Sequence, residues 1–234
     1  MQGAGNDYIY IDIIHIKNVL PIISKLCDRH YGIGGDGVVF VDYVDKRMIM
    51  YNADGSRGAI CGNALRCVGH LLYLATGEDC HVIHTDVGDR TVVRRGDKYV
   101  AAMGESKVLG RYDLDGNTAY LVDVGNLHLV VSGEYDPKDV AERLTRFAPQ
   151  LVGHVNVEVI QDELVEVYER GTGYTLSCGS GAVAVATAMW ESGLQKDRVD
   201  VKMPGGVLVV SIRDNINYLE GNAVITFRGQ YDIE

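Results

Sequence analysis

An internal repeat constrains the fold of this 234-residue chain more than any other feature of its sequence. A shift of 117 positions places Cys61 on Cys178 and Tyr51 on Tyr168. In each half, a β-like run ("RMIMY" or "LVEVY") and a glycine-containing turn precede the cysteine, and a helix-like stretch and alternating strands follow it. One repeat of this length in each half predicts two similar α/β domains, because a solenoid has a much shorter period.

Strands are predicted for much of the remaining chain. Runs rich in β-branched residues and bounded by Gly, Asp or Asn occupy residues 37–44, 91–95, 99–103, 118–124, 155–160, 206–212 and 223–227. Helices are predicted over residues 18–30 and 137–147. We therefore expect domains at residues 1–106 and 107–221, with the tail 222–234 returning to the first domain as a strand.

Charge and composition argue against several classes of partner. The chain has a net charge of −10 and contains no cluster of Lys and Arg, which argues against nucleic acid or an anionic membrane as a partner. The apolar start, residues 8–23, is interrupted by Asp12, His15 and Lys17, so it predicts a strand and a connection rather than a secretory signal or a membrane-spanning helix. We therefore expect a cytoplasmic protein that acts on a small molecule.

The cysteines do not suggest a disulfide framework. There are five of them, an odd number, and none belongs to a C-x-x-C pair, which also disfavours a structural zinc site. Cys27, Cys67 and Cys80 are expected to fill the core as small apolar side chains. Cys61 and Cys178 stand apart because both occur in the repeated motif.

One glycine-rich motif, "GIGGDG" at residues 32–37, matches the dinucleotide-binding pattern G-x-G-x-x-G. That fingerprint requires a strand before it and a helix after it. Here a helix-like stretch precedes the motif and the strand "VVFVDYV" follows it. The motif is therefore predicted to be a turn, and no G-x-x-x-x-G-K-[ST] phosphate-binding loop occurs in the sequence.

The two repeated cysteines each begin a predicted helix. Cys-Gly-Asn at residues 61–63 and Cys-Gly-Ser at residues 178–180 place small residues behind the thiol. The first amides of a helix have no internal partner and lie at the positive end of its dipole, so they lower a thiol pKa and can bind a carboxylate. If the two helix starts face one another, one thiolate removes a proton from an α-carbon and the opposite thiol delivers a proton to the other face. The pattern therefore predicts stereoinversion.

The motifs resemble the signature of the diaminopimelate epimerase family. "NADGSRGAICGNALR", residues 52–66, meets every specified position of N-x-D-G-S, four residues, C-G-N-[GA]-x-R. The start "GAGNDYIYID", the turn "GIGGDG", the segment "VGNLHLVV" and the run "YERGTGYTLSCGSGA" resemble the other motifs of the family and follow in the same order. Leu127 departs from the family pattern, because it replaces the usual proline after Gly-Asn.

The resemblance implies a fold and an activity. The implied fold is α/β with two pseudo-symmetric domains, each a mostly antiparallel β-sheet or barrel around a central helix. The implied activity is that of an isomerase that interconverts LL- and meso-diaminopimelate in the biosynthesis of lysine and peptidoglycan precursors. By the same resemblance the enzyme needs no pyridoxal phosphate and no metal, and no other cofactor is expected. The sequence does not fix the oligomeric state, and a homodimer is one alternative.

The roles of the family's residues carry over to the matching positions of this chain. Cys61 and Cys178 would be the catalytic acid/base pair, and His128 and Glu169 would be the catalytic polar pair near the reacting amino group. Arg170 suits bidentate recognition of the distal carboxylate. The substrate-binding set that the resemblance implies is Asn6, Asn52, Gly62, Asn63, Asn126, Asn156, Glu169, Arg170, Gly179 and Ser180.

Three other interpretations remain open. A redox protein would use Cys61 and Cys178 as a dithiol, but the sequence lacks the C-x-x-C arrangement typical of such proteins. A binding protein without catalysis is disfavoured because both thiols and their polar partners are present. A racemase of another amino acid with the same two-cysteine mechanism is the main alternative, because the sequence does not measure substrate preference.

Overall fold

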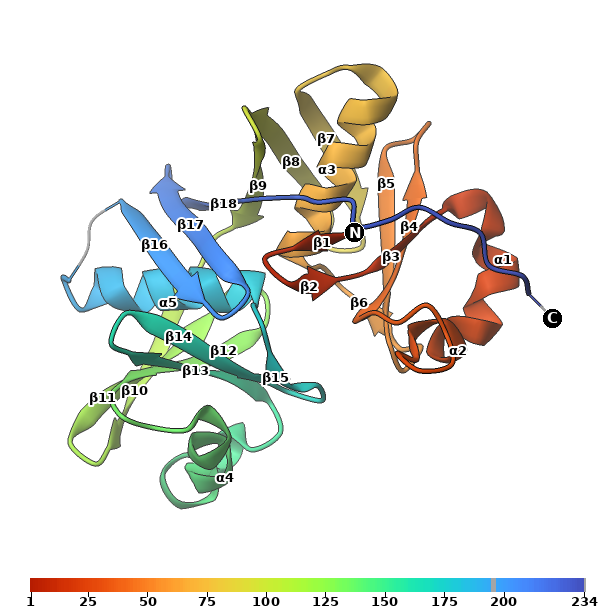
Figure 1. Ribbon diagram of the computed structural model, residues 1–234. Coiled ribbons are helices and arrows are strands. Elements are labelled where there is room, and N and C mark those ends of the chain that lie inside the picture. The colour runs from red at the N-terminus through yellow and green to blue at the C-terminus, as the bar shows by residue number, and fades with distance from the viewer. Residues whose placement is uncertain (195–196, 234) are drawn as a thin grey trace. The chain divides into compact units, whose positions relative to one another are not determined.

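The structure, a computed structural model, describes residues 1–194 and 197–233. The chain forms two compact units, and each contains paired strands and a helix that begins at one of the repeated cysteines (Figure 1). The first unit comprises Met1–Gly3, Asp7–Tyr99 and the tail from Asn222, and the second comprises Ala4–Asn6 and Val100–Gly221.

The first unit is built from a mixed sheet and the helix α3 (Gly62–Thr76), which packs on β7 and β8. The strands of this sheet are β3 (Ile9–Asp12), β4 (Gly37–Asp42), β5 (Arg47–Asn52), β6 (Arg57–Gly58), β7 (Cys80–Thr85) and β8 (Gly88–Arg95). Antiparallel pairs join β4 to β5, β5 to β6 and β7 to β8, whereas β3 runs parallel to β4 and β5 parallel to β7. The short strands β1 (Gln2–Gly3) and β2 (Asn6–Asp7) precede the sheet, and β9 (Lys98–Gly104) leads from the first unit into the second.

The helical segment near the N-terminus differs from the helix predicted over residues 18–30. It consists of the short pieces η1 (Ile13–His15), α1 (Ile16–Val19), η2 (Leu20–Ile22) and α2 (Ile23–Cys27). Pro21 lies within η2, and because proline has no amide hydrogen it interrupts the α-helical hydrogen bonds there. The buried side chains of Ile23 and Leu26 belong to the same core as Phe40 of β4.

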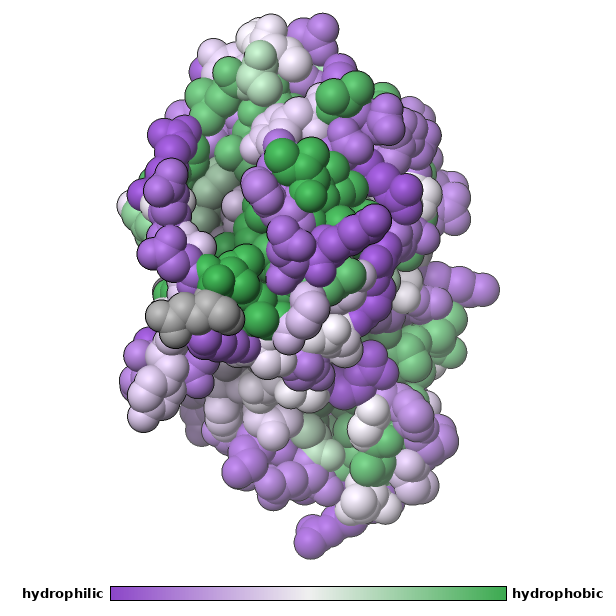
Figure 2. Space-filling view, turned by 90° about the vertical axis from the view of Figure 1, so that its right-hand side faces the viewer, coloured by the Kyte–Doolittle hydropathy of each residue, from purple (hydrophilic) through white to green (hydrophobic). Residues whose placement is uncertain are grey.

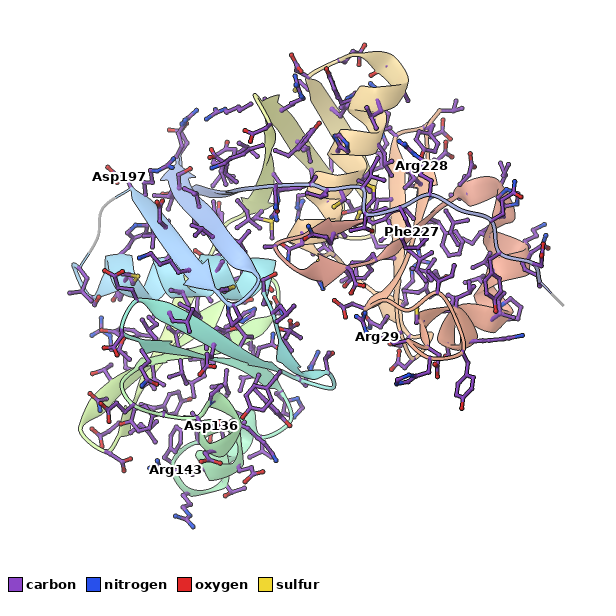
Figure 3. The ribbon with its side chains drawn as sticks, viewed as in Figure 1. Arg29, Asp136, Arg143, Asp197, Phe227 and Arg228 are labelled. Carbon is purple, nitrogen blue, oxygen red and sulfur yellow. The ribbon has the colours of Figure 1, made fainter. Side chains whose placement is uncertain are left out.

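Residues 32–36 lie in the turn between α2 and β4, as the sequence predicts, and the last residue of the motif, Gly37, begins β4. Gly34 has a φ of +84°, a conformation that glycine adopts without strain. The amide of Asp36 donates to the Asp7 carbonyl at 2.7 Å. The guanidinium of Arg29, which Figure 3 labels, pairs with the carboxylates of Asp7 and Asp36 at 2.6 and 3.0 Å. The turn is therefore tied to Asp7, the last residue of β2.

The second unit is built from a larger set of strands and two helices. Its strands are β10 (Lys107–Leu114), β11 (Asn117–Asp123), β12 (Leu127–Ser132), β13 (Val155–Gln161), β14 (Leu164–Glu169), β15 (Gly173–Thr175), β16 (Arg198–Met203), β17 (Gly206–Arg213) and β18 (Ile216–Gly221). Antiparallel pairs predominate, and the parallel pairs are β12 with β13 and β14 with β16. The helix α5 (Gly179–Glu191) packs on β12, β13, β16 and β17.

The second helix of this unit, α4 (Pro137–Phe147), has the bounds that the sequence predicts. The side chain of Asp136, which Figure 3 labels beside α4, caps the helix by accepting hydrogen bonds from the amides of Lys138 and Asp139 at 2.9 and 3.1 Å. Pro137 occupies the first turn, where its missing amide hydrogen costs nothing. The helix is followed by the short η3 (Pro149–Leu151).

The secondary structure confirms the repeat and the α/β class with mostly antiparallel pairing. The strands β5 and β14 begin at residues 47 and 164, and the helices α3 and α5 begin at residues 62 and 179, so both pairs are 117 positions apart. The pairing repeats as well, since β5 runs parallel to β7 and β14 runs parallel to β16.

The tail beyond β18 pairs with the first unit at one point. Val224 and Gln2 exchange two main-chain hydrogen bonds of 2.9 Å. The sequence predicts a strand over residues 222–234, but the described residues of the tail form no strand, because β1 offers only two residues for pairing.

Most large apolar side chains lie in the cores of the two units. The face seen in Figure 2 is mostly hydrophilic and carries separate, smaller hydrophobic areas. Within residues 1–194 and 197–233, no helix is long and apolar enough to cross a membrane.

Candidate active site

Cys61 is the last residue before α3, and side-chain hydrogen bonds hold the loop that leads to it. Its backbone is extended (φ −133°, ψ 121°), so the helix begins at Gly62. Asn52 Nδ2 donates to Ser56 Oγ at 2.9 Å, and Ser56 donates its amide and its hydroxyl to Asp54 at 2.8 and 2.6 Å. The hydroxyl and amide of Ser56 lower the pKa of Asp54. The motif N-x-D-G-S is therefore an ordered loop that leads to the thiol.

A buried cation, Arg66, lies just inside α3. Its side chain is completely buried, and its Nη2 donates to Asn63 Oδ1 at 2.8 Å. Its Nε donates to the Asn222 carbonyl at 3.3 Å. Burial lowers the pKa of Arg66, because removal from water disfavours the charged form. The guanidinium thus orients Asn63, one of the predicted carboxylate-binding residues.

Cys178 occupies the same place before α5. Its backbone is extended (φ −128°, ψ 120°), and its sulfur accepts a hydrogen bond from the Gly181 amide at 3.4 Å and lies 3.4 Å from Ser180 Oγ. The sequence predicts a lowered thiol pKa at a helix start, but the pKa of Cys178 is raised well above its usual value. Burial is the largest cause, followed by the negative charges of Glu169 and Glu158. Burial of the thiolate therefore outweighs the helix amides at this position.

His128 and Glu158 form a buried pair on neighbouring strands. Both side chains are 0% exposed, and His128 Nδ1 lies 2.7 Å from Glu158 Oε1. The register of the parallel strands β12 and β13 sets His128 opposite Asn156. Because side chains alternate along a strand, Asn156 and Glu158 project from the same face of β13. The sequence predicts His128 and Glu169 near the reacting amino group, and Glu158 is a further residue that it did not identify. The alternation in "VNVEVI" is the signal that could have found it, because it places residues 156 and 158 on one face.

Glu169 and Arg170 lie at the end of β14. Glu169 Oε1 accepts a hydrogen bond from Thr175 Oγ1 at 2.7 Å. The main-chain amide of Arg170 donates to Asn156 Oδ1 at 2.9 Å, while the Arg170 side chain is exposed. Asn156 therefore fixes the main chain at the point where the Arg170 side chain leaves the sheet.

The predicted site residues divide between the two units. The first unit holds Asn52, Cys61, Gly62 and Asn63. The second unit holds Asn6, Asn126, His128, Asn156, Glu169, Arg170, Cys178, Gly179 and Ser180. Each unit thus contains one Cys-Gly-x helix start, and the second also holds the buried pair His128–Glu158.

The other three cysteines differ in their surroundings. Cys27 and Cys67 are buried, as predicted, and burial raises the pKa of Cys27 to about 11. Cys80 is exposed, so the prediction of a core position is wrong for it. Side chains alternate along β7, and this alternation points His81 and Ile83 inward and Cys80 outward. Among the residues that the structure describes, no group of three or more His, Cys, Asp or Glu is arranged to hold a metal ion.

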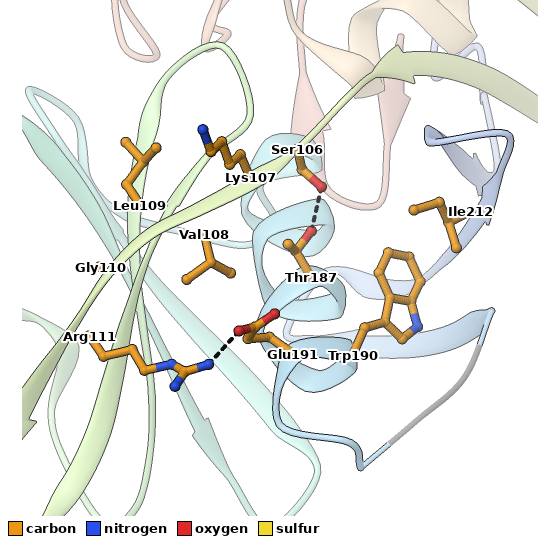
Figure 4. A pocket seen from close by; sticks show the side chains of 10 residues that line it. All are labelled: Ser106, Lys107, Val108, Leu109, Gly110, Arg111, Thr187, Trp190, Glu191 and Ile212. Atoms are coloured by element: carbon orange, nitrogen blue, oxygen red, sulfur yellow. Dashed lines mark hydrogen bonds and ion pairs between the residues drawn. The ribbon is translucent and has the colours of Figure 1, made fainter.

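A pocket of about 610 Å³ lies in the second unit, at the opposite end of α5 from Cys178 (Figure 4). Thr187 and Ser106 share a hydrogen bond of 2.7 Å in its wall, and Arg111 pairs with Glu191. None of the predicted site residues belongs to its lining, so the chemistry of the two helix starts is separate from this pocket.

Sequence comparisons match nearly the whole chain. A family model described as diaminopimelate epimerase matches residues 1–109 and 120–226. A protein of Desulfovibrio desulfuricans named diaminopimelate epimerase is 35% identical over 278 residues, covering 100% of this chain and 97% of the relative. A protein of the same name from Acetivibrio thermocellus is 33% identical over 275 residues, covering 100% of this chain and 97% of the relative.

Solved structures share the fold. A Pseudomonas aeruginosa protein described as a predicted epimerase superimposes with a TM-score of 0.71 at 17% identity, covering 93% of this chain and 90% of that chain. A phenazine biosynthesis protein of the PhzF family from Enterococcus faecalis superimposes with a TM-score of 0.65 at 15% identity, covering 93% and 88%. At these identities the likeness concerns the fold alone.

Proposed function

The chain belongs to the diaminopimelate epimerase family, and from this we propose that it epimerises diaminopimelate through two cysteine thiols. The reaction interconverts the LL and meso forms and belongs to lysine biosynthesis. The observation that carries the proposed mechanism is the pair of matched helix starts, with Cys61 before α3 and Cys178 before α5. Full-length similarity to proteins named diaminopimelate epimerase supports the choice of substrate.

The mechanism requires that both thiols reach the same α-carbon of the substrate. One thiolate takes the α-proton from one face, and the electron pair of that C–H bond forms a new C–H bond with the proton that the other thiol delivers to the opposite face. At the end the two sulfurs have exchanged protonation states, so every proton and electron is accounted for. The amides at Gly62–Asn63 and Gly179–Ser180 hold the α-carboxylate, where negative charge develops in the transition state.

The binding roles rest on the chemistry of the side chains around the two cysteines. Arg170 binds the distal carboxylate with its planar fork, and the hydrogen bond from its amide to Asn156 supports this role by fixing its main chain. His128 and Glu169 bind near the reacting amino group. The amide side chains that hold the rest of the substrate are Asn6, Asn52, Asn126 and Asn156.

The proposal extends to the organisation of the chain. The domain of residues 1–106, joined by the tail 222–234, supplies Cys61, and the domain of residues 107–221 supplies Cys178. A cytoplasmic location fits an enzyme of amino-acid biosynthesis. Light scattering of the purified protein decides whether it works as a monomer or a homodimer.

Deuterium incorporation from D₂O tests the function. LL-diaminopimelate should exchange its α-proton for deuterium and convert to the meso form, while a panel of other amino acids should not. Exchange into another amino acid but not into diaminopimelate would instead favour a racemase of that amino acid.

Three alanine variants test the mechanism. Cys61→Ala and Cys178→Ala should each abolish epimerisation, because each leaves one face of the α-carbon without a proton carrier. Cys80→Ala is the matched control and should keep full activity, because Cys80 is exposed on β7. Near-normal turnover of either of the first two variants contradicts the two-thiol mechanism.

A further inference from the structure

Arg170 lies in a tight turn between β14 and β15, two strands of the second unit that Figure 1 labels. The amide of Thr172 donates to the Glu169 carbonyl at 3.2 Å across this turn. Gly171 and Gly173 have φ values of +81° and +89°, which glycine adopts without strain. Because glycine is the most conformationally free residue, contacts from other elements decide how firmly this turn is held.

The main-chain pairing of the hairpin is short. β15 contributes three residues and pairs with β14 alone among the strands that the structure describes. On the other side of β14, Asn156 of β13 accepts the hydrogen bond from the Arg170 amide at 2.9 Å. A hairpin of this length is at best marginally stable by itself, so the position of its second strand depends on side-chain contacts.

The side chains of β15 point to two different faces of the hairpin. The register sets Tyr174 opposite Tyr168 and Thr175 opposite Val167. The two tyrosine rings meet edge to face, with their centroids 5.3 Å apart. Because side chains alternate along a strand, Tyr174 leaves β15 on the face opposite to that of Thr175, which donates to Glu169.

The hydroxyl of Tyr174 reaches the start of α4. It donates to the Asp136 carboxylate, whose two oxygens lie 2.6 and 2.7 Å away. Asp136 is also the N-cap of α4 and accepts hydrogen bonds from the amides of Lys138 and Asp139. The cap already orients the carboxylate, so little further conformational freedom is lost when Tyr174 binds it.

The hydrogen bond is charge-assisted. The Tyr174 hydroxyl, followed by the two amides of the cap, lowers the pKa of Asp136. The carboxylate is therefore ionised at neutral pH, and hydrogen bonds to an ionised acceptor are shorter and stronger than those between neutral groups.

The helix that carries Asp136 is packed on the sheet that carries Arg170. α4 contacts β13 and β14, and its buried Val140 and Leu144 belong to the same core as Val157 of β13. Asp136 therefore has a defined position relative to the strand that ends at the turn. Its hydrogen bond to Tyr174 ties the returning strand of the hairpin to the body of the second unit.

We propose that the hydrogen bond between Tyr174 and Asp136 is a latch that holds the turn in the position from which Arg170 binds the distal carboxylate. The latch deepens the function proposed above and rests on it for its catalytic meaning. Tyr174 and Asp136 are positioning residues, because they act through Arg170. With the turn held, less conformational freedom is lost when Arg170 binds the substrate, so the affinity for the substrate is higher.

The latch should affect substrate binding more than proton transfer. Cys178 follows the hairpin closely, but other contacts hold the chain there. The Leu176 carbonyl accepts a hydrogen bond from the Gly205 amide at 2.7 Å, and the Cys178 sulfur accepts one from the Gly181 amide at 3.4 Å. Loss of the latch should therefore free the turn, leave the thiol in place, and raise KM with little change in kcat.

Two variants remove the latch from its two ends. Tyr174→Phe deletes the hydroxyl and keeps the ring, and Asp136→Ser keeps a residue that caps helices but is too short to reach Tyr174. Because Tyr174 is 53% exposed and water competes for the bond, each should raise the KM for diaminopimelate by about three- to tenfold. The double variant should raise it no further. A wild-type KM in either variant, or a loss confined to kcat, would overturn the proposal.

Tyr135→Phe is the matched control. The Tyr135 hydroxyl donates to the Leu114 carbonyl at 2.9 Å, so the variant deletes a similar hydrogen bond next to Asp136 and leaves the latch intact. Its KM should equal that of the wild type. An equal rise in KM would show that any loss of a tyrosine hydroxyl in this region has the same effect, which would overturn the proposal.

A second cycle tests whether the latch acts through Arg170. In the Arg170→Ala background, Tyr174→Phe should leave KM unchanged, because no guanidinium remains to be positioned. A rise by the same factor as in the presence of Arg170 would overturn the positioning role.

Trypsin measures the latch without substrate. It cleaves after arginine, and cleavage in the exposed turn at Arg170 follows the fraction of the protein in which the turn is open. Mass spectrometry after brief digestion of the whole protein should show this cut at least about threefold faster in Tyr174→Phe and Asp136→Ser, and unchanged in Tyr135→Phe.

The two readouts keep the claims separate. Faster cleavage in a protein that exchanges no deuterium into diaminopimelate would refute the proposed function and leave the latch standing as the contact that holds the turn. Deuterium exchange with unchanged cleavage and unchanged KM would refute the latch alone.

Discussion

Substitution of Gly181 by alanine is the smallest change that should disturb the start of α5. The added methyl group would lie 2.6 Å from Glu158 Oε1, which is closer than packed carbon and oxygen atoms approach. Glu158 is completely buried, so it cannot turn into solvent to make room. It must instead move away from the helix, and the movement stretches its 2.7 Å hydrogen bond to His128.

Three effects determine how much Gly181→Ala changes the free energy of unfolding. Overpacking of a buried site costs about 1–3 kcal/mol. Loss of a hydrogen bond to a charged group costs about 1.5–3 kcal/mol. Alanine favours a helix over glycine by about 0.8–1 kcal/mol, which offsets part of this loss. We therefore expect Gly181→Ala to lower the free energy of unfolding by about 2–4 kcal/mol, or Tm by roughly 5–15 °C for a chain of this length.

Calorimetry and epimerase kinetics measure the effect, and Gly69→Ala in α3 is the control. An alanine methyl there would lie 2.4 Å from Val92 Cγ1, so it overpacks an apolar contact without touching a charged pair. Gly69→Ala should lower Tm and leave kcat near the wild-type value. Gly181→Ala should lower both, because it shifts the groups around the Cys178 thiol.

A double-mutant cycle tests whether the contact with Glu158 causes the loss of stability. In the Glu158→Ala background the methyl group at position 181 meets no carboxylate, so Gly181→Ala should become neutral or stabilising there. A wild-type Tm for Gly181→Ala alone would show that the methyl group does not displace the Glu158 side chain. An equal loss of Tm with and without Glu158 would show the same.

Three further predictions concern specificity, redox state and pH. Arg170→Lys should raise the KM for diaminopimelate by about tenfold or more, because an ammonium group cannot replace the planar fork, and an unchanged KM and kcat would exclude Arg170 from the distal carboxylate. Mild oxidation should abolish activity through a disulfide between Cys61 and Cys178, with recovery on adding a dithiol, and peptide mapping that finds any other pairing contradicts this. Asp136 accepts a hydrogen bond from Tyr174 and raises its pKa to about 12, so this bond should stabilise the fold fully below pH ~10 and lose its effect as the pH rises through about 12. Asp136→Asn should return the Tyr174 pKa toward its usual value in an NMR titration of ring-labelled tyrosine, and an unchanged value would show that another group sets it.

The repeated elements could be predicted from the sequence because local patterns determine them. The runs "RMIMY" and "LVEVY" alternate as strands do, and the structure has β5 and β14 there. The helix over residues 137–147 follows from an N-cap aspartate and a proline in the first turn, both of which act within a few residues of the chain. The tail was less predictable, since its pairing depends on a partner strand only two residues long. The first helix was also less predictable, since Pro21 interrupts it.

The buried pair His128–Glu158 could not be identified from spacing, because its two members lie 30 positions apart and meet only through the parallel pairing of β12 and β13. The family resemblance places His128 and Glu169 near the reacting amino group of the substrate and says nothing of Glu158. The register of β12 and β13 brings Glu158 to His128, and Glu169 accepts a hydrogen bond from Thr175.

The two cysteines look equivalent in sequence, but a helix start is only one of the influences on the pKa of a thiol. A helix start stabilises a nearby negative charge by about 0.3–1 kcal/mol, and up to ~2 kcal/mol where it is partly buried. Removing an ion from water costs several kcal/mol, and adjacent carboxylates add to that cost for a thiolate. Cys178 is buried and faces Glu158 and Glu169, so the second effect exceeds the first and the pKa of its thiol rises. The motif Cys-Gly-x specifies only the helix start, which both halves share. Burial and charge come from strands far away in the sequence, and they break the symmetry that the repeat would otherwise impose on the chemistry.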